Sequence, residues 1–152
     1  VTLKALSTSQ IVQRALDDAE VLIKTSGPQS AVDRVHTAFH GYLHHLANEA
    51  SVTTLSIRPT MTELFKAVRS SHPALATLGP QGSEIARVFQ AMATILDALN
   101  PVRNNASVAH PTGQLLGESE AVLVINCVRT LLGYLEAKRR EVAAVSVPTP
   151  NP

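Results

Sequence analysis

Apolar residues recur at every third or fourth position along each long segment of this chain, which is the spacing of one helix face. Glycine and proline cluster between these segments, as at Gly27-Pro28 and Gly79-Pro80, where they interrupt the pattern. The β-branched stretch SVTTLSIRPT, residues 51–60, has no partner with which it could form a sheet. The sequence therefore predicts an all-α fold, a bundle of four to five helices joined by short connections.

The glycine, proline and candidate capping residues between these segments give the expected helix boundaries. We predict helices over 9–25, 29–50, 60–71, 83–100 and 118–143, with residues 72–82 and 110–119 forming loops around and between them. Thr60 and Glu63 have the spacing of a capping box, and Ser83 is a candidate cap for the fourth helix. Asn100-Pro101 is expected to kink or restart that helix.

The apolar positions also predict which face of each helix is buried. The inner faces are expected to comprise Val12, Ala15, Leu16, Ala19, Leu22 and Ile23; then Val32, Val35, Phe39, Leu43 and Leu46; then Ile85, Val88, Phe89, Met92, Leu96 and Leu99. The middle of the last helix, AVLVINCVRTLLGYL, is apolar on nearly all sides. Such a helix is either central in the bundle or shared with another subunit.

Length and composition limit the classes of function. A chain of 152 residues fits one domain, which we place at 1–143, followed by a flexible proline-rich tail at 144–152. Because the chain begins with Val1, the sequence leaves open whether it is full length or a fragment. Thirteen Lys and Arg against twelve Asp and Glu exclude a strongly basic nucleic-acid protein, so RNA or DNA contacts must depend on a local cluster. An aromatic content of 3% argues against broad base-stacking platforms.

The sequence also predicts the compartment. Cys127 is the single cysteine, so an internal disulfide is impossible, and its apolar surroundings predict a buried structural thiol. We find no secretion signal and no apolar run long enough to span a bilayer. We therefore expect a cytoplasmic protein that does not associate with membranes.

The stretch RNNASVAHP, residues 103–111, combines polar side chains that suit phosphodiester chemistry. Arg103 and His110 are seven positions apart, about two turns of helix, and they can also converge if the helix ends at Asn104. Arginine presents a planar fork of donors that matches a phosphate, and histidine can give or take a proton near neutral pH. RNA cleavage needs no metal, because its 2′-hydroxyl is an internal nucleophile. A purely structural interpretation stays open, in which Arg103 and the asparagines cap the helix end.

Two stretches in this region resemble a known family. ALNPVRNNASVAHP followed by ESEAVLVINCVRTLLGYL resembles the C-terminal domain of abortive infection proteins, a branch of the HEPN superfamily. Upstream, DRVHTAFHGYLHHL resembles the second helix of those proteins, so that the likeness covers about residues 31–135. The superfamily signature is an arginine, often followed by a polar residue, and a histidine after a gap of four to six residues; here Asn104 follows Arg103, and six residues separate Arg103 from His110.

The resemblance implies an all-α HEPN-like domain that forms a two-fold dimer, with the motifs of both protomers meeting in a cleft. It implies a metal-independent endoribonuclease, with RNA as substrate and no cofactor, that acts as a toxin in bacterial antiviral defence. Arg103 would bind the scissile phosphate, His110 would be the general acid or base, and Asn104 would orient either of them. The products would carry 2′,3′-cyclic phosphate and 5′-hydroxyl ends. A cognate antitoxin or a further domain of the same defence system is an expected partner, although Pro111 replaces the tyrosine that some members use for antitoxin control.

Histidines on the second predicted helix are further candidates. His36, His40 and His44 recur at a spacing of four, which can bind zinc, but successive members drift around the helix and no acidic pair or cysteine cluster completes a ligand set. We therefore predict no metal site. His36 and His40 are instead assigned to substrate binding together with Asn105, in the cleft that holds His110; the alternative is local hydrogen bonding on a helix flank.

Lys138, Arg139 and Arg140 near the end of the last helix have two interpretations. They complement the helix dipole, or they contact an RNA backbone. For the chain as a whole, the alternative to a nuclease is a non-catalytic HEPN dimerisation or nucleotide-sensing module of a larger defence protein. A plain helical adaptor is the third possibility.

Overall fold

The computed structural model describes residues 7–105 and 116–145, without the side chains of residues 98–105. The helices are α1 (Thr8–Thr25), α2 (Pro28–Glu49), α3 (Met61–Ser71), the 3-10 helix η1 (Pro73–Leu75), α4 (Gly82–Asn105) and α5 (Glu118–Val145). The described part of the chain contains no strand, so the predicted all-α class and the bundle of five α-helices are confirmed.

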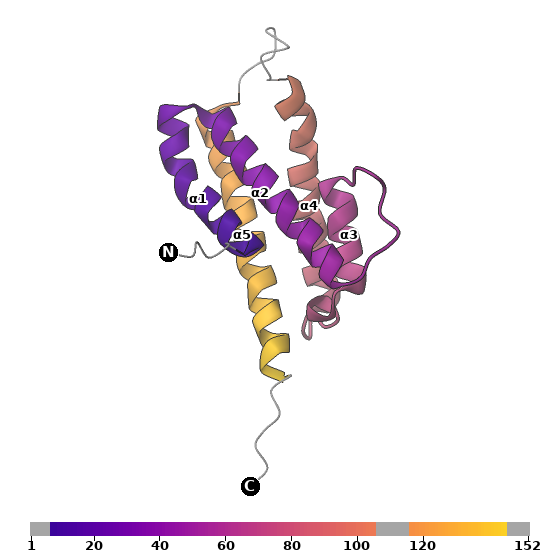
Figure 1. Cartoon of the computed structure of the whole chain (residues 1–152). Helices are drawn as coiled ribbons and strands as arrows, with labels where there is room; N and C mark the ends of the chain where they lie inside the picture. The colour runs from indigo at the N-terminus through magenta and orange to yellow at the C-terminus, as the bar shows by residue number, and fades with distance from the viewer. Residues whose placement is uncertain (1–6, 106–115, 146–152) are drawn as a thin grey trace, which may run out of the picture.

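Helices α2 and α5 form the centre of the bundle (Figure 1). Helix α2 packs against α1, α3 and α5, while α5 packs against α1, α2, α4 and η1. The placement of α5 explains its broad apolar surface, because neighbours cover it on several sides. Helix α4 completes the bundle by packing against α3 and α5.

The sharp turn between α1 and α2 follows the predicted glycine and proline. Gly27 adopts φ 94°, a left-handed conformation that glycine reaches at little steric cost, and Pro28 is the first residue of α2. At the other end of α1, the Ser7 hydroxyl accepts from the backbone N of Gln10, and the Gln10 side chain accepts from the backbone N of Ser7. This capping box lies just before the predicted start of the helix.

Helix α3 has only half of the predicted capping box. The Thr60 hydroxyl accepts from the backbone N of Glu63 at 3.1 Å, as expected. The main partner of the Glu63 carboxylate is instead Ser56, whose backbone N and hydroxyl donate to it at 2.8 and 2.9 Å. Glu63 thereby ties the irregular 51–60 segment to α3.

Three predicted boundaries of α4 and α5 are corrected. Helix α4 begins at Gly82, so Ser83 is not its cap, and the Ser83 hydroxyl donates to Glu84 Oε2 at 2.9 Å. The helix continues through Pro101 to Asn105. Helix α5 extends to Val145, so the first two residues of the predicted 144–152 tail are helical and the remainder lies outside the described residues.

Most of the predicted core is buried, including every apolar position assigned to α2. The three phenylalanines and two tyrosines of the chain all take part in ring contacts: Phe39 with Tyr42, Phe65 with Phe89, and Phe89 with Tyr134. Cys127 is buried as predicted, and burial raises the pKa of its thiol, which makes it a poor nucleophile. No helix within the described ranges combines the length and apolarity needed to cross a membrane.

The inner face of α4 differs from the prediction. Phe89, Ala93 and Leu96 are buried there, whereas the side chain of Val88 is 56% exposed. Ile85 and Met92 are only partly buried. The buried face is therefore rotated away from the predicted stripe, and a second apolar face of the helix is left facing solvent.

Candidate functional site

The predicted catalytic stretch begins in the last turn of α4. Arg103, Asn104 and Asn105 are the final three residues of this helix. His110 lies outside the described residues, so its convergence with Arg103 remains a prediction. Helix α4 ends at the same end of the bundle at which α5 begins (Figure 1). The backbone thus places Arg103 at one end of the molecule rather than in its middle.

His36 and His40 lie together in a surface pocket of about 350 Å³, which we call the α2 pocket. It is lined by His36, Thr37 and His40 of α2 and by Arg58, Pro59, Thr60 and Met61 before and at the start of α3. His40 Nε2 donates to the Pro59 carbonyl oxygen at 2.9 Å, and Pro59 is itself buried. This bond orients the imidazole, and the neutral ring then keeps Nδ1 as an acceptor.

Sequence reasoning missed Arg58, which adds a cation to the α2 pocket. Its side chain is exposed, and it precedes the buried Pro59 and the cap residue Thr60. Spacing along the chain does not link it to His36, because the two meet only when the 51–60 segment folds back on α2. The one sequence feature that could have pointed to Arg58 is its place just before Pro59 and Thr60 at the start of a predicted helix. Within the part of the chain that the structure describes, no residue of α4 lines this pocket.

The four histidines of α2 differ in their exposure and in their hydrogen-bond partners. His36 is buried with 6% exposure, His40 is bound to Pro59, and His44 is exposed. His45 forms an ion pair with Glu49 at 3.0 Å. Across residues 7–97 and 116–145, no group of three or more His, Cys, Asp or Glu side chains is arranged so that it could hold a metal ion.

A polar network joins α2, η1 and α5 on another side of the bundle. Glu49 pairs with His45, with His72 and with Arg139. Arg139 also donates to Glu136 at 2.9 Å, and the fully buried Tyr42 donates its hydroxyl to the same Glu136 oxygen. Burial, followed by the bond to Glu136, raises the pKa of Tyr42, so this tyrosine stays protonated and acts as a donor.

The charges in this network control the protonation of Glu49. Desolvation by burial is the largest single influence and would raise the pKa of Glu49. The hydrogen bond from His72 and the charges of Arg139, His45 and His72 together outweigh it, so the pKa of Glu49 is lowered. A carboxylate with a lowered pKa in the folded state stabilises the fold above its unfolded pKa, and this contribution is lost as the pH falls through the acid range.

We predict that Glu49→Gln lowers the free energy of unfolding by about 1 kcal/mol at neutral pH. The difference from the unsubstituted protein should shrink as the pH falls from 6 towards 3, because the unfolded state takes up the Glu49 proton first and the lowered folded-state pKa then favours folding less and less. Urea unfolding at several pH values measures it. Glu20→Gln, on the exposed surface of α1, is the control; a Glu49 effect that stays constant down to pH 3 would contradict the assignment.

The three cations near the end of α5 have different partners. Lys138 pairs with Glu141 at 2.7 Å, and Arg139 pairs with Glu49 and Glu136. Arg140 is exposed and forms no ion pair with a described residue. Helix α5 runs on to Val145 and has no basic residue in its last turn, so helix-dipole compensation accounts poorly for this cluster. Of the three cations, only Arg140 is available to an external ligand.

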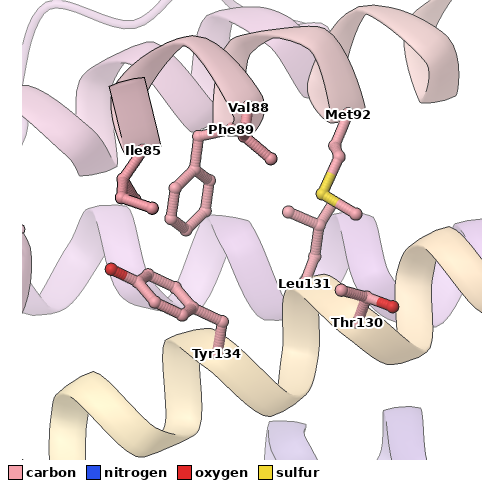
Figure 2. Close-up of a pocket in the computed structure, with 7 residues that line it drawn as sticks. All are labelled: Ile85, Val88, Phe89, Met92, Thr130, Leu131 and Tyr134. Atoms are coloured by element: carbon pink, nitrogen blue, oxygen red, sulfur yellow. The ribbon is translucent and has the colours of Figure 1, made fainter. Parts of the chain in front are cut away.

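The exposed face of α4 carries an apolar row that we call the α4 stripe: Ile85, Val88, Met92 and Ile95. Their spacing of three and four residues is that of a heptad seam, and Leu99 and Val102 continue it in the sequence. One edge of the stripe borders a pocket of about 120 Å³ between α4 and α5 (Figure 2). Around this pocket, the stripe residues Ile85, Val88 and Met92 lie opposite Thr130 and Tyr134 of α5. Val88 and Ile95 are 56% and 41% exposed, which is unusual for large apolar side chains arranged in a row.

Comparison with known proteins places the chain in a family. The family model Abi_C, described as a HEPN-like domain, matches residues 10–139. Neither the search of curated proteins nor the search of solved structures found a match. The matched range runs from the first turn of α1 to the last third of α5, and it includes the Arg103 to His110 stretch.

Proposed function

The chain belongs to the Abi_C family of HEPN-like domains, and we propose that it is a metal-independent endoribonuclease of a bacterial abortive infection system. The proposal rests on one observation: the arginine–histidine motif lies inside the residues that match the family model. Arg103 and Asn104 lie in the last turn of α4, and His110 follows seven positions after Arg103. We place the enzyme in the cytoplasm, where its RNA substrate is found.

Each motif residue receives a role from its chemistry. The Arg103 guanidinium binds the scissile phosphate by paired hydrogen bonds and stabilises the charge that develops on its non-bridging oxygens. His110 acts as general base towards the 2′-hydroxyl or as general acid towards the 5′-oxygen that leaves. Asn104 orients the phosphate or the imidazole. The 2′-oxygen attacks phosphorus and the bond to the 5′-oxygen breaks, so the ends are a 2′,3′-cyclic phosphate and a 5′-hydroxyl.

Substrate binding is assigned to Asn105 and to the α2 pocket. Asn105 follows the motif directly at the end of α4. In the α2 pocket, the oriented His40 supplies an acceptor and the exposed Arg58 supplies a cation, of the kind that RNA hydroxyls and phosphates need, while the buried His36 forms part of the wall. These features support binding of nucleotides on either side of the cleaved bond.

We further propose that the active form is a homodimer that pairs through the α4 stripe. A heptad row on one helix is self-complementary, because the same row on a second copy can pack against it around a two-fold axis. Arg103 follows Met92 by eleven residues, about three turns, so helical periodicity puts both on one face of α4. Pairing through the stripe would bring the two copies of Arg103 towards the interface.

A non-catalytic dimerisation or nucleotide-sensing module of a larger defence protein is the competing function. It uses the same α4 stripe but does not need the arginine and the histidine to act on RNA. Regulation by a cognate antitoxin is compatible with both functions.

The test is cleavage of end-labelled RNA by the purified protein in excess EDTA. We expect cleavage to continue without added metal and to disappear in a combined Arg103→Ala and His110→Ala variant. Expression of the unsubstituted protein should arrest growth of the host, and the double variant should not. Equal toxicity of the two proteins together with no cleavage by either would favour the non-catalytic module.

A further inference from the structure

A second polar groove of about 370 Å³ lies between the start of α1 and the middle of α5, in a different part of the surface from the α2 pocket. Ser9, Gln10 and Gln13 of α1 line one wall. The other wall comes from α5 and includes Arg129, Gly133, Glu136 and Arg140. We call it the α1–α5 groove; Arg140 is the one residue in its lining that the sequence already marked as a candidate RNA contact.

Both arginines of the groove are available to an external anion. Arg140 forms no ion pair with any described residue, in contrast to its neighbours Lys138 and Arg139. Arg129 is exposed, and its hydrogen-bond partner is neutral: Nη1 donates to Asn126 Oδ1 at 3.2 Å. Each guanidinium therefore keeps several donors for a phosphate.

The spacing of the two arginines fits an extended polyanion better than a single small anion. Arg129 and Arg140 are eleven positions apart, which is about 16 Å along α5 and three turns, so both lie on one side of the helix. Gly133 lies between them, and a Cβ added there would meet nothing within 4 Å. The floor of the groove is therefore open along the line that joins the two cations.

Glu136 and the glutamines supply contacts for a sugar. Tyr42 and Arg139 both donate to Glu136 Oε1, so Oε2 is the oxygen that can accept from a ligand hydroxyl. The bond from Arg139 offsets the charge of this carboxylate and limits its repulsion of a phosphate. The Gln10 carbonyl oxygen is used by the Ser7 backbone, which leaves its amide protons as donors.

We propose that the α1–α5 groove binds the backbone of single-stranded RNA, with Arg129 and Arg140 on separate phosphates and Glu136 accepting from a ribose 2′-hydroxyl. This inference deepens the proposed function and rests on it, since it takes RNA as the ligand. A 2′-hydroxyl contact distinguishes RNA from DNA at such a site. The groove would hold a substrate strand at a distance from the cleavage site and would take no part in the chemistry.

The experiment measures RNA binding by fluorescence anisotropy in a His110→Ala background, so that cleavage does not interfere. We expect Arg129→Gln with Arg140→Gln to weaken binding of a labelled single-stranded RNA about tenfold or more. The slope of log affinity against log salt should fall by about 1.4, roughly 0.7 for each phosphate that the variant no longer neutralises. The matched control is Arg69→Gln with Arg87→Gln, two exposed arginines of α3 and α4, which should leave affinity and slope unchanged.

A second pair of variants tests the groove by filling it. Gly133→Glu places a carboxylate in the open floor and should weaken binding as strongly as the double arginine variant. Gly133→Ala adds only a methyl group and favours the helix, so binding should persist. Unchanged affinity in both the arginine variant and Gly133→Glu would overturn the proposal, as would the absence of RNA binding by the parent protein. Equal affinity for RNA and for DNA of the same sequence would remove the role of Glu136.

The outcome is separable from that of the nuclease proposal. Groove-dependent binding by a protein that does not cleave RNA would support the groove and reject the nuclease. Cleavage that is insensitive to all groove variants, with unchanged binding, would reject the groove alone.

Discussion

Replacing His110 with alanine is expected to slow RNA cleavage by about 10²- to 10⁴-fold, the range typical of the removal of a general acid or base. The effect should appear in the rate of the chemical step under single-turnover conditions, while RNA affinity changes little. His110 is assigned to proton transfer and not to binding, so these two readouts separate its role from a structural one.

His44→Ala is the matched control for this prediction. His44 is an exposed histidine of α2 that lies outside the α2 pocket, so its replacement should leave the rate unchanged. Circular dichroism and thermal unfolding of the His110 variant establish that the bundle is intact. A variant that is folded and cleaves at the parent rate would show that His110 is not the proton donor or acceptor.

The combined substitution Val88→Glu and Ile95→Glu is expected to convert the proposed dimer into a monomer. These two side chains are 56% and 41% exposed in the single chain, so carboxylates are tolerated there by the isolated fold. At a two-fold interface the same carboxylates would be desolvated and would face their copies, and we expect dimer affinity to fall at least about 100-fold. Sedimentation velocity over a range of concentrations measures the change.

Val21→Glu supplies the control for dimerisation. Val21 is 61% exposed on α1, so it is as accessible as Val88 but does not belong to the α4 stripe. It should leave the dimer unchanged. If the active site needs both protomers, the stripe variant should also lose RNA cleavage; a stripe variant that remains dimeric would reject this interface.

Helix positions are well predicted because each helix has a periodic apolar face and recognisable ends. Gly27 and Pro28 mark the turn between α1 and α2, as expected from their backbone preferences. The prediction for the buried face of α4 is confirmed at Phe89 and Leu96 and wrong at Val88, because this helix has two apolar faces. Phe89 faces the core and Val88 faces solvent. Hydropathy alone cannot tell these two faces apart, because an apolar side chain has the same hydropathy whether it packs inside its own chain or against another chain.

Contacts between distant segments explain what the sequence could not predict about the candidate site. His36 and His40 share a pocket, but the cation that joins them there, Arg58, is supplied by a segment beyond the end of α2. Similarly, Arg139 has the sequence position of a free cation at a helix end, and the fold places it between Glu49 and Glu136. The partners of Arg58 and Arg139 depend on which segments pack beside each helix, and the helical periodicity of the sequence does not contain that information.

Analysis of the RNA ends made by the purified protein in EDTA tests the central claim most directly. We predict 2′,3′-cyclic phosphate and 5′-hydroxyl ends, identified by mass spectrometry of the fragments, because the 2′-oxygen is the nucleophile and no metal-bound water takes part. Fragments with 5′-phosphate ends, or cleavage that requires a divalent metal, would contradict the roles assigned to Arg103 and His110.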